Sequence, residues 1–252
     1  MELQKTVLVT GSSRGLGAII AKQFGAKGYR VIVNYFRNEE KAMQVVEEIG
    51  DDRAIAIKAD VRDKQQVESM ILEAVQQFGP IEVVVNNALI NFEFNPVTQK
   101  KVEELTWENY NEQFEGTVKS ALNVIQAVLP EMKRAHYGRI INIGTNLFQN
   151  PVVPYHQYTT AKTALIGFTR NMAKELGAYG ITVNMVSGGL LQKTDASAVT
   201  TPEVFDLIAT NSPLNRVTEP TDVAEVVVFI GTEASRGITG QNIVVDSGLT
   251  MN

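Results

Sequence analysis

The chain has 252 residues, a formal net charge of −5 and no cysteine, which excludes disulfides, thiolate zinc sites and a cysteine nucleophile. It has only two histidines and no basic tail, so we predict no metal site and no nucleic-acid partner. No apolar run is long enough for a membrane span or the core of a signal peptide, so we expect no membrane association and, most simply, a cytoplasmic location.

Short apolar runs rich in valine and isoleucine alternate with longer amphipathic segments along the chain. The predicted strands are residues 6–10, 30–34, 54–58, 81–86, 139–143, 181–186 and 242–245. The predicted helices are residues 15–27, 39–49, 64–77, 107–132, 158–176 and 222–230. Strands that are apolar at nearly every position are typical of a parallel sheet covered on both faces. We therefore predict one α/β domain over residues 1–252, a Rossmann-type doubly wound sheet of seven parallel strands with helices on both faces.

One stretch, residues 187–217, breaks this alternation. It follows the carboxyl end of a predicted strand, where open α/β sheets bind their ligands. Long irregular insertions in compact domains are usually lids or binding loops, so we interpret it as a lid over the substrate. The alternative is a surface excursion without a role in binding.

A glycine-rich turn follows the first predicted strand and leads directly into a helix. Its spacing is G-x-x-x-G-x-G, and glycine allows the backbone N–H groups to approach a pyrophosphate closely at the helix N-terminus. A plain turn before a helix is the alternative, but the position at the first strand-to-helix junction favours a nucleotide cofactor. The candidate cofactor-binding residues here are Gly11, Ser13, Arg14, Gly15, Leu16 and Gly17.

The end of the second strand indicates which cofactor is bound. An NAD site usually has a carboxylate there for the ribose 2′-hydroxyl, whereas this chain has Asn34 followed by Tyr35, Phe36 and Arg37. Arg14 and Arg37 are cations that can bind a 2′-phosphate, so we predict NADP(H). Further candidates for cofactor binding end the third and fourth strands, namely Asp60 and Val61, then Asn87 and Ala88.

Tyr158 and Lys162 lie four residues apart and therefore on one face of a predicted helix. A fixed cation beside a phenol favours the phenolate, which suits acid–base catalysis near neutral pH. Thr145 follows the strand 139–143 and carries a hydroxyl that can bind a substrate carbonyl beside the tyrosine. Taken alone, Tyr158 and Lys162 would fit an ordinary surface pair, and Thr145 would fit a turn residue.

In this order and spacing, these motifs resemble the classical short-chain dehydrogenase/reductase family, and the resemblance covers the whole chain. The closest subgroup is the 3-oxoacyl-[acyl-carrier-protein] reductases, to which residues 138–143, 180–184 and 238–241 are similar. The resemblance implies reduction of a carbonyl by NADPH, with a 3-oxoacyl thioester as the best substrate class. It also implies acyl carrier protein as a partner and a homotetramer or homodimer.

The resemblance also implies roles for individual residues. Tyr158 would donate the proton, and Lys162 would bind the nicotinamide ribose and lower the pKa of the tyrosine. Thr145 stands where the family has a substrate-orienting serine, and Thr117 where it commonly has an asparagine of a proton relay. Gly189 would contact the nicotinamide.

The chain departs from the family pattern at several of these places. Leu89 replaces a glycine, Gly188 replaces a proline, and threonines stand at 117 and 145. These changes leave two alternatives open. One is a family member that acts on another small ketone, alcohol or sugar, and the other is a catalytically weak NADPH-binding sensor.

Overall fold

The structure is a computed structural model that describes residues 4–90, 92, 94–95, 97–192 and 200–251. Residues 193–199 of the predicted lid therefore lie outside the described residues. Within the described part of the chain, no helix is both long and apolar enough to cross a membrane.

All seven strands belong to one parallel sheet, as predicted, and their order in it is β3-β2-β1-β4-β5-β6-β7. The strands are β1 (Thr6–Val9), β2 (Arg30–Tyr35), β3 (Ala54–Lys58), β4 (Ile81–Asn86), β5 (Gly138–Thr145), β6 (Ile181–Gly188) and β7 (Asn242–Val245). The main difference from the prediction is that β5 and β6 run two residues further. Their paired ends, Thr145 beside Gly188, bring two predicted site segments together.

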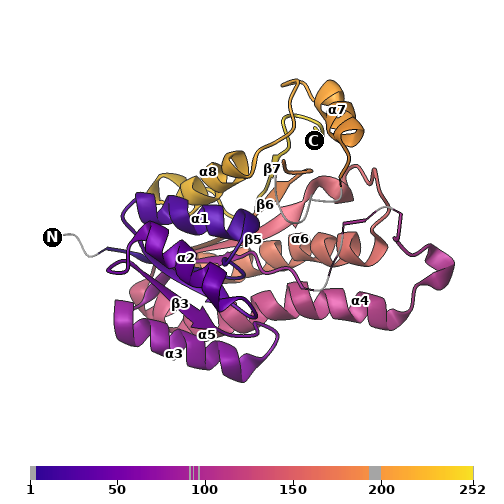
Figure 1. The fold of residues 1–252 in the computed structure, drawn as a ribbon. Coiled ribbons are helices and arrows are strands. Elements are labelled where there is room, and N and C mark those ends of the chain that lie inside the picture. The colour runs from indigo at the N-terminus through magenta and orange to yellow at the C-terminus, as the bar shows by residue number, and fades with distance from the viewer. Residues whose placement is uncertain (1–3, 91, 93, 96, 193–199, 252) are drawn as a thin grey trace.

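Helices cover both faces of the sheet. The α-helices are α1 (Gly15–Ala26), α2 (Glu39–Ile49), α3 (Lys64–Phe78), α4 (Trp107–Phe114), α5 (Ser120–Ala135), α6 (His156–Leu176), α7 (Pro202–Asn211) and α8 (Pro220–Ile230). Figure 1 shows α1, α2 and α8 on one side of the sheet, with α3 and α5 on the other.

Successive strand residues alternate between two apolar cores, because neighbouring side chains of a strand point to opposite faces. Val7 and Val9 pack with α1, α2 and α8, whereas Leu8 between them packs with α3, α5 and α6. All three side chains are fully buried. Burial on both faces explains why the strands are apolar at nearly every position and lack a polar stripe.

The segment predicted as one helix over 107–132 is divided in the structure. A π-helical turn, Glu115–Lys119, separates α4 from α5. The extra residue of a π turn changes the direction in which the following side chains point, and such turns are frequent at functional sites. Gly116 fits here because a Cβ at this position would lie 3.0 Å from the Cβ of Ile90.

Candidate active site

The site lies at the carboxyl edge of the sheet, where β1 and β4 meet. The chain leaves these two central strands toward opposite sides, which is the topological switch point where open α/β sheets bind ligands. Thr10 follows β1, and Asn87 and Ala88 follow β4. The two segments are joined by hydrogen bonds from the backbone N–H groups of both Asn87 and Ala88 to the hydroxyl of Thr10, each 3.0 Å.

The glycine turn requires glycine for two different reasons: a positive φ, found at Gly11 and Gly15, and close packing, found at Gly11 and Gly17. Gly11 has φ +62°, and a Cβ there would also lie 2.9 Å from the Cα of Ala88. Gly17 has no such φ, but a Cβ would lie 2.4 Å from the side-chain nitrogen of Asn87. That nitrogen donates to the carbonyl oxygen of Thr10 at 2.9 Å, so the turn is closed by contacts that leave no room for a side chain.

Helix α1 offers features that fit a pyrophosphate. Arg14, the residue before the helix, makes no side-chain capping hydrogen bond, and no acidic residue lies in the first turn. The backbone N–H groups of Gly15, Leu16 and Gly17 have no acceptor within the helix, because the first residues of any helix lack one. A Cβ on Gly15 would meet no atom within 4 Å, so the space beside the Gly15 backbone is open to a ligand, and Ser13, two residues earlier, is half-buried.

Asn34 supports the turn from within the protein. Its side chain is 2% exposed, its Oδ1 accepts from the N–H of Gly11 at 3.1 Å, and its Nδ2 donates to the carbonyl oxygen of Ala59 at 3.1 Å. Both ends of the amide are used internally, so the structure gives Asn34 a supporting place where we predicted contact with the cofactor. Arg37 is exposed, and its guanidinium lies 5.5 Å from the ring centre of Phe36.

The Asp60 carboxylate, a predicted cofactor-binding group, is already paired with Arg62. The Nη2–Oδ2 distance is 2.7 Å and the Nε–Oδ1 distance is 3.0 Å. The hydrogen bond with Arg62 holds the pKa of the Asp60 carboxyl below its usual value. The next residue, Val61, is buried, and its carbonyl oxygen accepts from Asn123 on α5 at 3.0 Å.

Tyr158, Thr145 and Lys162 meet at the ends of β5 and α6, and all three are buried. The hydroxyl of Thr145 is hydrogen-bonded to the Tyr158 phenol. The ammonium of Lys162 donates to the carbonyl oxygen of Ile143 at 2.7 Å and lies 6.0 Å from the ring centre of Tyr158. The structure thus brings together the phenol, hydroxyl and cation that the sequence predicted as a catalytic group.

The pKa of Tyr158 differs in direction from our expectation. Burial raises the pKa of Tyr158 to about 12, an effect that the hydrogen bond from Thr145 only partly offsets, and burial lowers the pKa of Lys162 to about 8. We expected Lys162 to lower the pKa of the tyrosine. The reason for the difference is that removal from water disfavours the charged form of both groups. At neutral pH the phenol therefore carries its proton, which is the form that can donate to a carbonyl.

An aromatic cluster encloses the phenol. The ring of Phe92 stacks on Tyr158 with 4.7 Å between ring centres, and Phe94 meets Tyr158 edge-on at 5.0 Å. Tyr155 packs against both phenylalanines at 5.3 and 5.6 Å. These rings keep water from Tyr158 and so account for its raised pKa.

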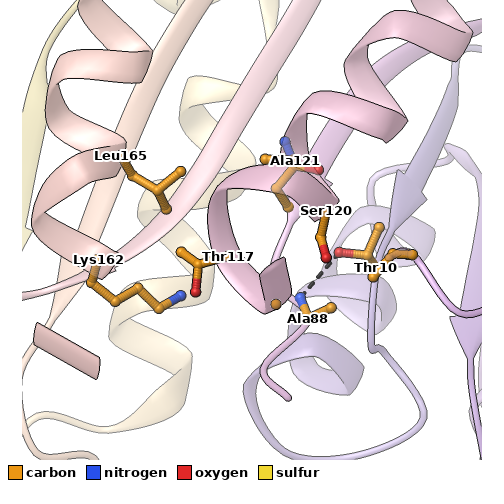
Figure 2. Close-up of a pocket in the computed structure, with 10 residues that line it drawn as sticks. Thr10, Ala88, Thr117, Ser120, Ala121, Lys162 and Leu165 are labelled. Carbon is orange, nitrogen blue, oxygen red and sulfur yellow. Dashed lines mark hydrogen bonds between the residues drawn. The ribbon is translucent and has the colours of Figure 1, made fainter. Parts of the chain in front are cut away.

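A small internal cavity lies on the other side of the lysine. Its volume is about 10 Å³, and its lining includes Lys162, Thr117 and Asn86. Figure 2 shows Lys162 reaching from α6 toward Thr117 on the π-helical turn. The Oδ1 of Asn86 is buried and has no hydrogen-bond partner in the structure. A polar cavity of this size, with a cation and an unsatisfied acceptor in its wall, fits a single ordered water.

Gly189 lies at the far side of the site, after β6. A Cβ there would come within 3.0 Å of the side-chain nitrogen of Asn146, which donates to the carboxylate of Asp246 at 3.0 Å. The backbone of this segment therefore lies close against a fixed polar pair. Further along the segment predicted as a lid, Leu191 forms a parallel bridge with Thr218, which joins the start of that segment to the residue that follows it.

Comparison with known proteins agrees with this geometry. The family model described as Enoyl-(Acyl carrier protein) reductase matches residues 11–250. The 3-oxoacyl-[acyl-carrier-protein] reductase FabG of Staphylococcus aureus (strain Mu50) is 38% identical, over 100% of both chains. The chain belongs to the short-chain dehydrogenase/reductase family.

Solved structures support the same assignment. A double mutant of the Serratia marcescens short-chain dehydrogenase/reductase has a TM-score of 0.87 and 29% identity over 99% of each chain. A blue fluorescent protein from a metagenomic library, solved in complex with NADPH, has a TM-score of 0.86 and 32% identity over 100% of each chain. As a family member, the protein is an NAD(P)-dependent oxidoreductase.

Sequence reasoning missed three features of this short-chain dehydrogenase/reductase site. They are the aromatic cluster around Tyr158, the pairing of Asp60 with Arg62 and the unsatisfied Asn86. The F-x-F spacing of Phe92 and Phe94 was a usable signal, because such a pair in the loop after β4 lies near the carboxyl edge of the sheet. The other two depend on side-chain positions that no spacing indicates.

Proposed function

We propose that the protein is an NADPH-dependent reductase that converts a carbonyl to an alcohol, with 3-oxoacyl thioesters as its main substrate class. The observation that carries the proposal is the buried group of Tyr158, Thr145 and Lys162, in which the lysine ammonium lies 6.0 Å from the ring centre of Tyr158. Burial raises the pKa of Tyr158 to about 12, which favours the protonated phenol at neutral pH. The full-length similarity to a 3-oxoacyl-[acyl-carrier-protein] reductase supports the choice of substrate class.

In this proposal Tyr158 donates its proton to the carbonyl oxygen while the carbonyl is held by the hydroxyl of Thr145. Bound NADPH supplies the hydride that adds to the carbonyl carbon. The phenolate left behind is stabilised by the cation of Lys162 in a site of low polarity, where such attraction is strong. Phe92 moves off the phenol so that the carbonyl can reach it.

Tyr158 then recovers its proton through Lys162. A water in the internal cavity, bound by Lys162, Thr117 and the unsatisfied Oδ1 of Asn86, connects the ammonium to the next donor. Thr117 contributes a hydroxyl where the family commonly has an amide, so Asn86 takes over part of that role. General acid–base transfer of this kind contributes about 10²- to 10⁴-fold to the rate.

The cofactor preference in the proposal follows from charge at the end of β2. No carboxylate stands at Asn34 to accept from a ribose 2′-hydroxyl, and Arg37 is exposed nearby. Arg14, the residue before α1, is a second cation at the turn. A 2′-phosphate is favoured by this balance because cations bind it through charge-assisted hydrogen bonds.

Acyl carrier protein is the proposed carrier of the substrate, and a homotetramer or homodimer is the proposed assembly. A second candidate, an NADPH reductase of another small ketone, alcohol or sugar, keeps the same chemistry with a different substrate. The aromatic cluster beside Tyr158 favours an apolar group next to the reacting carbon over a sugar. A third candidate, an NADPH-binding sensor, would bind the cofactor without turnover.

The test follows the absorbance of NADPH with an acetoacetyl thioester and a panel of unrelated ketones and sugars, with NADH in parallel. Oxidation of NADPH with the thioester, and much less of NADH, is the expected result. Faster turnover of a sugar or another ketone would move the second candidate ahead. Tight NADPH binding without any turnover would favour the sensor.

A further inference from the structure

A buried carboxylate lies just after β7 and takes no part in the chemistry proposed above. Asp246 is 5% exposed, and its Oδ1 accepts from the N–H of Gly248 at 3.1 Å. Its Oδ2 accepts from the N–H and the hydroxyl of Thr250, at 3.0 and 2.6 Å, and from the Nδ2 of Asn146 at 3.0 Å. The first three contacts lie within the C-terminal turn (residues 246–250), whereas Asn146 comes from the segment after β5.

The contact between Asn146 and Asp246 is a strong constraint on both side chains. A hydrogen bond from a neutral donor to a carboxylate is shorter and about twice as strong as one between two neutral groups. Asn146 is 4% exposed, so its amide nitrogen has no bulk water that could replace the carboxylate as a partner. Removing either side chain would leave the other with an unsatisfied buried group, and the pair therefore fixes Asn146 in one position.

Asn146 follows Thr145 directly in the chain, and Thr145 carries the hydroxyl beside Tyr158. A short 3₁₀ turn begins at Asn146, and the Thr145 hydroxyl accepts from the N–H of Leu147 within it, at 3.3 Å. The N–H of Gln149 donates to the carbonyl oxygen of Asn146 at 2.9 Å and closes the turn. Fixing the Asn146 side chain therefore also fixes the backbone from which the Thr145 hydroxyl projects.

The same pair lies against the segment that follows β6. A Cβ on Gly189 would come within 3.0 Å of the Asn146 Nδ2 and 3.1 Å of the Asp246 Cβ, so the chain packs directly on the pair there. Next to Asp246, the hydroxyl of Ser247 lies 2.9 Å from that of Thr218, the residue that follows the segment predicted as a lid. The pair thus lies where the segments after β5, β6 and β7 meet.

We propose that Asp246 is a positioning residue of the reductase site. Through Asn146 it holds the turn that follows Thr145, so that the Thr145 hydroxyl stays aimed at the substrate carbonyl. The proposal rests on the proposed function and adds to it a residue that acts through two others. A hydroxyl that is already in place loses no further freedom when the carbonyl binds, so the effect is expected in the rate of the chemical step.

The test breaks the pair with Asn146→Leu, a side chain of similar size that cannot donate to Asp246. In NADPH oxidation with an acetoacetyl thioester, kcat should fall about tenfold, since misplacing a group by about 1 Å can cost about 10²-fold. The KM should change less than about threefold. The matched control is Asn184→Leu, the same change at a buried asparagine that joins β6 to residues 238 and 241, and its kcat should stay within about twofold.

A double-mutant cycle separates positioning from a general loss of stability. Thr145→Val removes the hydroxyl that the pair positions, so adding Asn146→Leu to it should lower kcat by less than about twofold. Asp246→Asn breaks the pair from the other end, because an amide accepts at only one of its two positions, and should lower kcat only while Thr145 is present. An equal loss with and without the Thr145 hydroxyl would overturn the proposal, as would an unchanged kcat in Asn146→Leu.

Hydrogen exchange of the backbone amides gives a measurement that needs no substrate. In Asn146→Leu the amides of Leu147 and Gln149 should exchange about fivefold faster than in the wild type, the equivalent of one net hydrogen bond. In Asn184→Leu they should keep their wild-type rates. Faster exchange in a protein that reduces no thioester would mean that the turn is held by the pair and that only the proposed function fails. Unchanged exchange in Asn146→Leu would overturn the positioning role even where the wild type is an active reductase.

Discussion

The turn that follows β1 and the aromatic cluster around Tyr158 both lie at the carboxyl edge of the sheet but are held by different forces. At the turn, hydrogen bonds that Asn87 donates to Thr10 and that Gly11 donates to Asn34 fix the backbone, and glycines leave no side chain to adjust. Around Tyr158, Phe92 and neighbouring rings hold the phenol mainly by packing. The first region suits a cofactor of constant shape, and the second can change with the substrate.

This comparison has a consequence for what each region can tolerate. A site built from closely packed backbone atoms loses its fit when a side-chain atom is added there, because the backbone groups cannot move independently of one another. A site made of side-chain packing tolerates changes of shape but depends on a few chemical groups. We therefore expect mutations at the turn to change the fit of the cofactor and the free energy of unfolding. Mutations around Tyr158 should act through proton transfer and the protonation of buried groups.

The largest effect is expected for Tyr158→Phe, which removes the proton donor and keeps the ring in its aromatic surroundings. The kcat should fall by about 10³-fold or more, since no other group touching the carbonyl can replace the phenol. The dissociation constant of NADPH, measured by fluorescence titration, should change by less than about threefold. Residual turnover above about a tenth of the wild-type rate would contradict the assigned role.

The protonation of Lys162 gives the second prediction, a pH-dependent stability. Lysine titrates near 10.5 in the unfolded chain, and its pKa is lowered to about 8 by burial in the fold. Below about pH 8 the fold therefore bears the full cost of a buried cation, and this cost disappears as the pH rises from 8 to 10.5. The total change is about 3 kcal/mol, since each pKa unit corresponds to about 1.4 kcal/mol.

Urea unfolding of the wild type and of Lys162→Met between pH 7 and 10 measures this effect. The unfolding free energy of the wild type should rise relative to the variant across that range. Because the pKa of Tyr158 is raised to about 12, its contribution to the unfolding free energy falls above pH 10 in both proteins. That contribution therefore cancels in the difference between them. A difference that does not change with pH would show that the lysine is solvated in solution.

Much of the turn that follows β1 was predictable from the sequence, because its determinants are local. The spacing of Gly11 and Gly17 after an apolar strand reflects a backbone constraint that any sequence with this turn must satisfy. The seven strands were equally visible, since burial on both faces leaves a continuous apolar run. The residue types, the local turn and the arrangement of the strands in the sheet all indicate the same fold.

The wall around Tyr158 was predicted only in part, because its contacts join residues far apart in the chain. Tyr158 and Lys162 share a helix face and were found together, but Phe92 comes from a loop with no periodic pattern. The packing of that loop contributes to the burial that raises the pKa of Tyr158. The sequence alone had led us to expect that Lys162 lowers this pKa. The π-helical turn at Glu115–Lys119 was missed because its residues fit an α-helix equally well.

A third prediction tests the fit at the turn. In Gly17→Ala the new methyl group would meet the side-chain nitrogen of Asn87 and the carbonyl oxygen of Gly11, at 2.4 and 2.7 Å. We expect a loss of about 1–3 kcal/mol in unfolding free energy and weaker binding of both NADPH and NADH.

The control for this prediction is Gly167→Ala on the exposed face of α6, where an added Cβ meets nothing within 4 Å. That variant should be stabilised by about 0.5–1 kcal/mol, because alanine favours a helix over glycine. Thermal unfolding measures the change in stability of both variants. A neutral result at Gly17 would mean that the turn relaxes more easily than its hydrogen bonds indicate.

The smallest expected effect separates the two cofactors at the edge of the turn. Arg37→Asp replaces an exposed cation with an anion, which attracts the ribose 2′-hydroxyl of NADH and repels the 2′-phosphate of NADPH. The Kd of NADPH should rise about tenfold, as for the loss of one charge-assisted hydrogen bond, while that of NADH changes less than about twofold.

Arg236→Asp makes the same charge change at another exposed position and should alter neither Kd. The shift should shrink as salt is raised, because surface charges are screened within about 10 Å at 0.1 M salt. Equal losses for both cofactors would place Arg37 outside the phosphate site and leave the turn, with Arg14, as the basis for any preference.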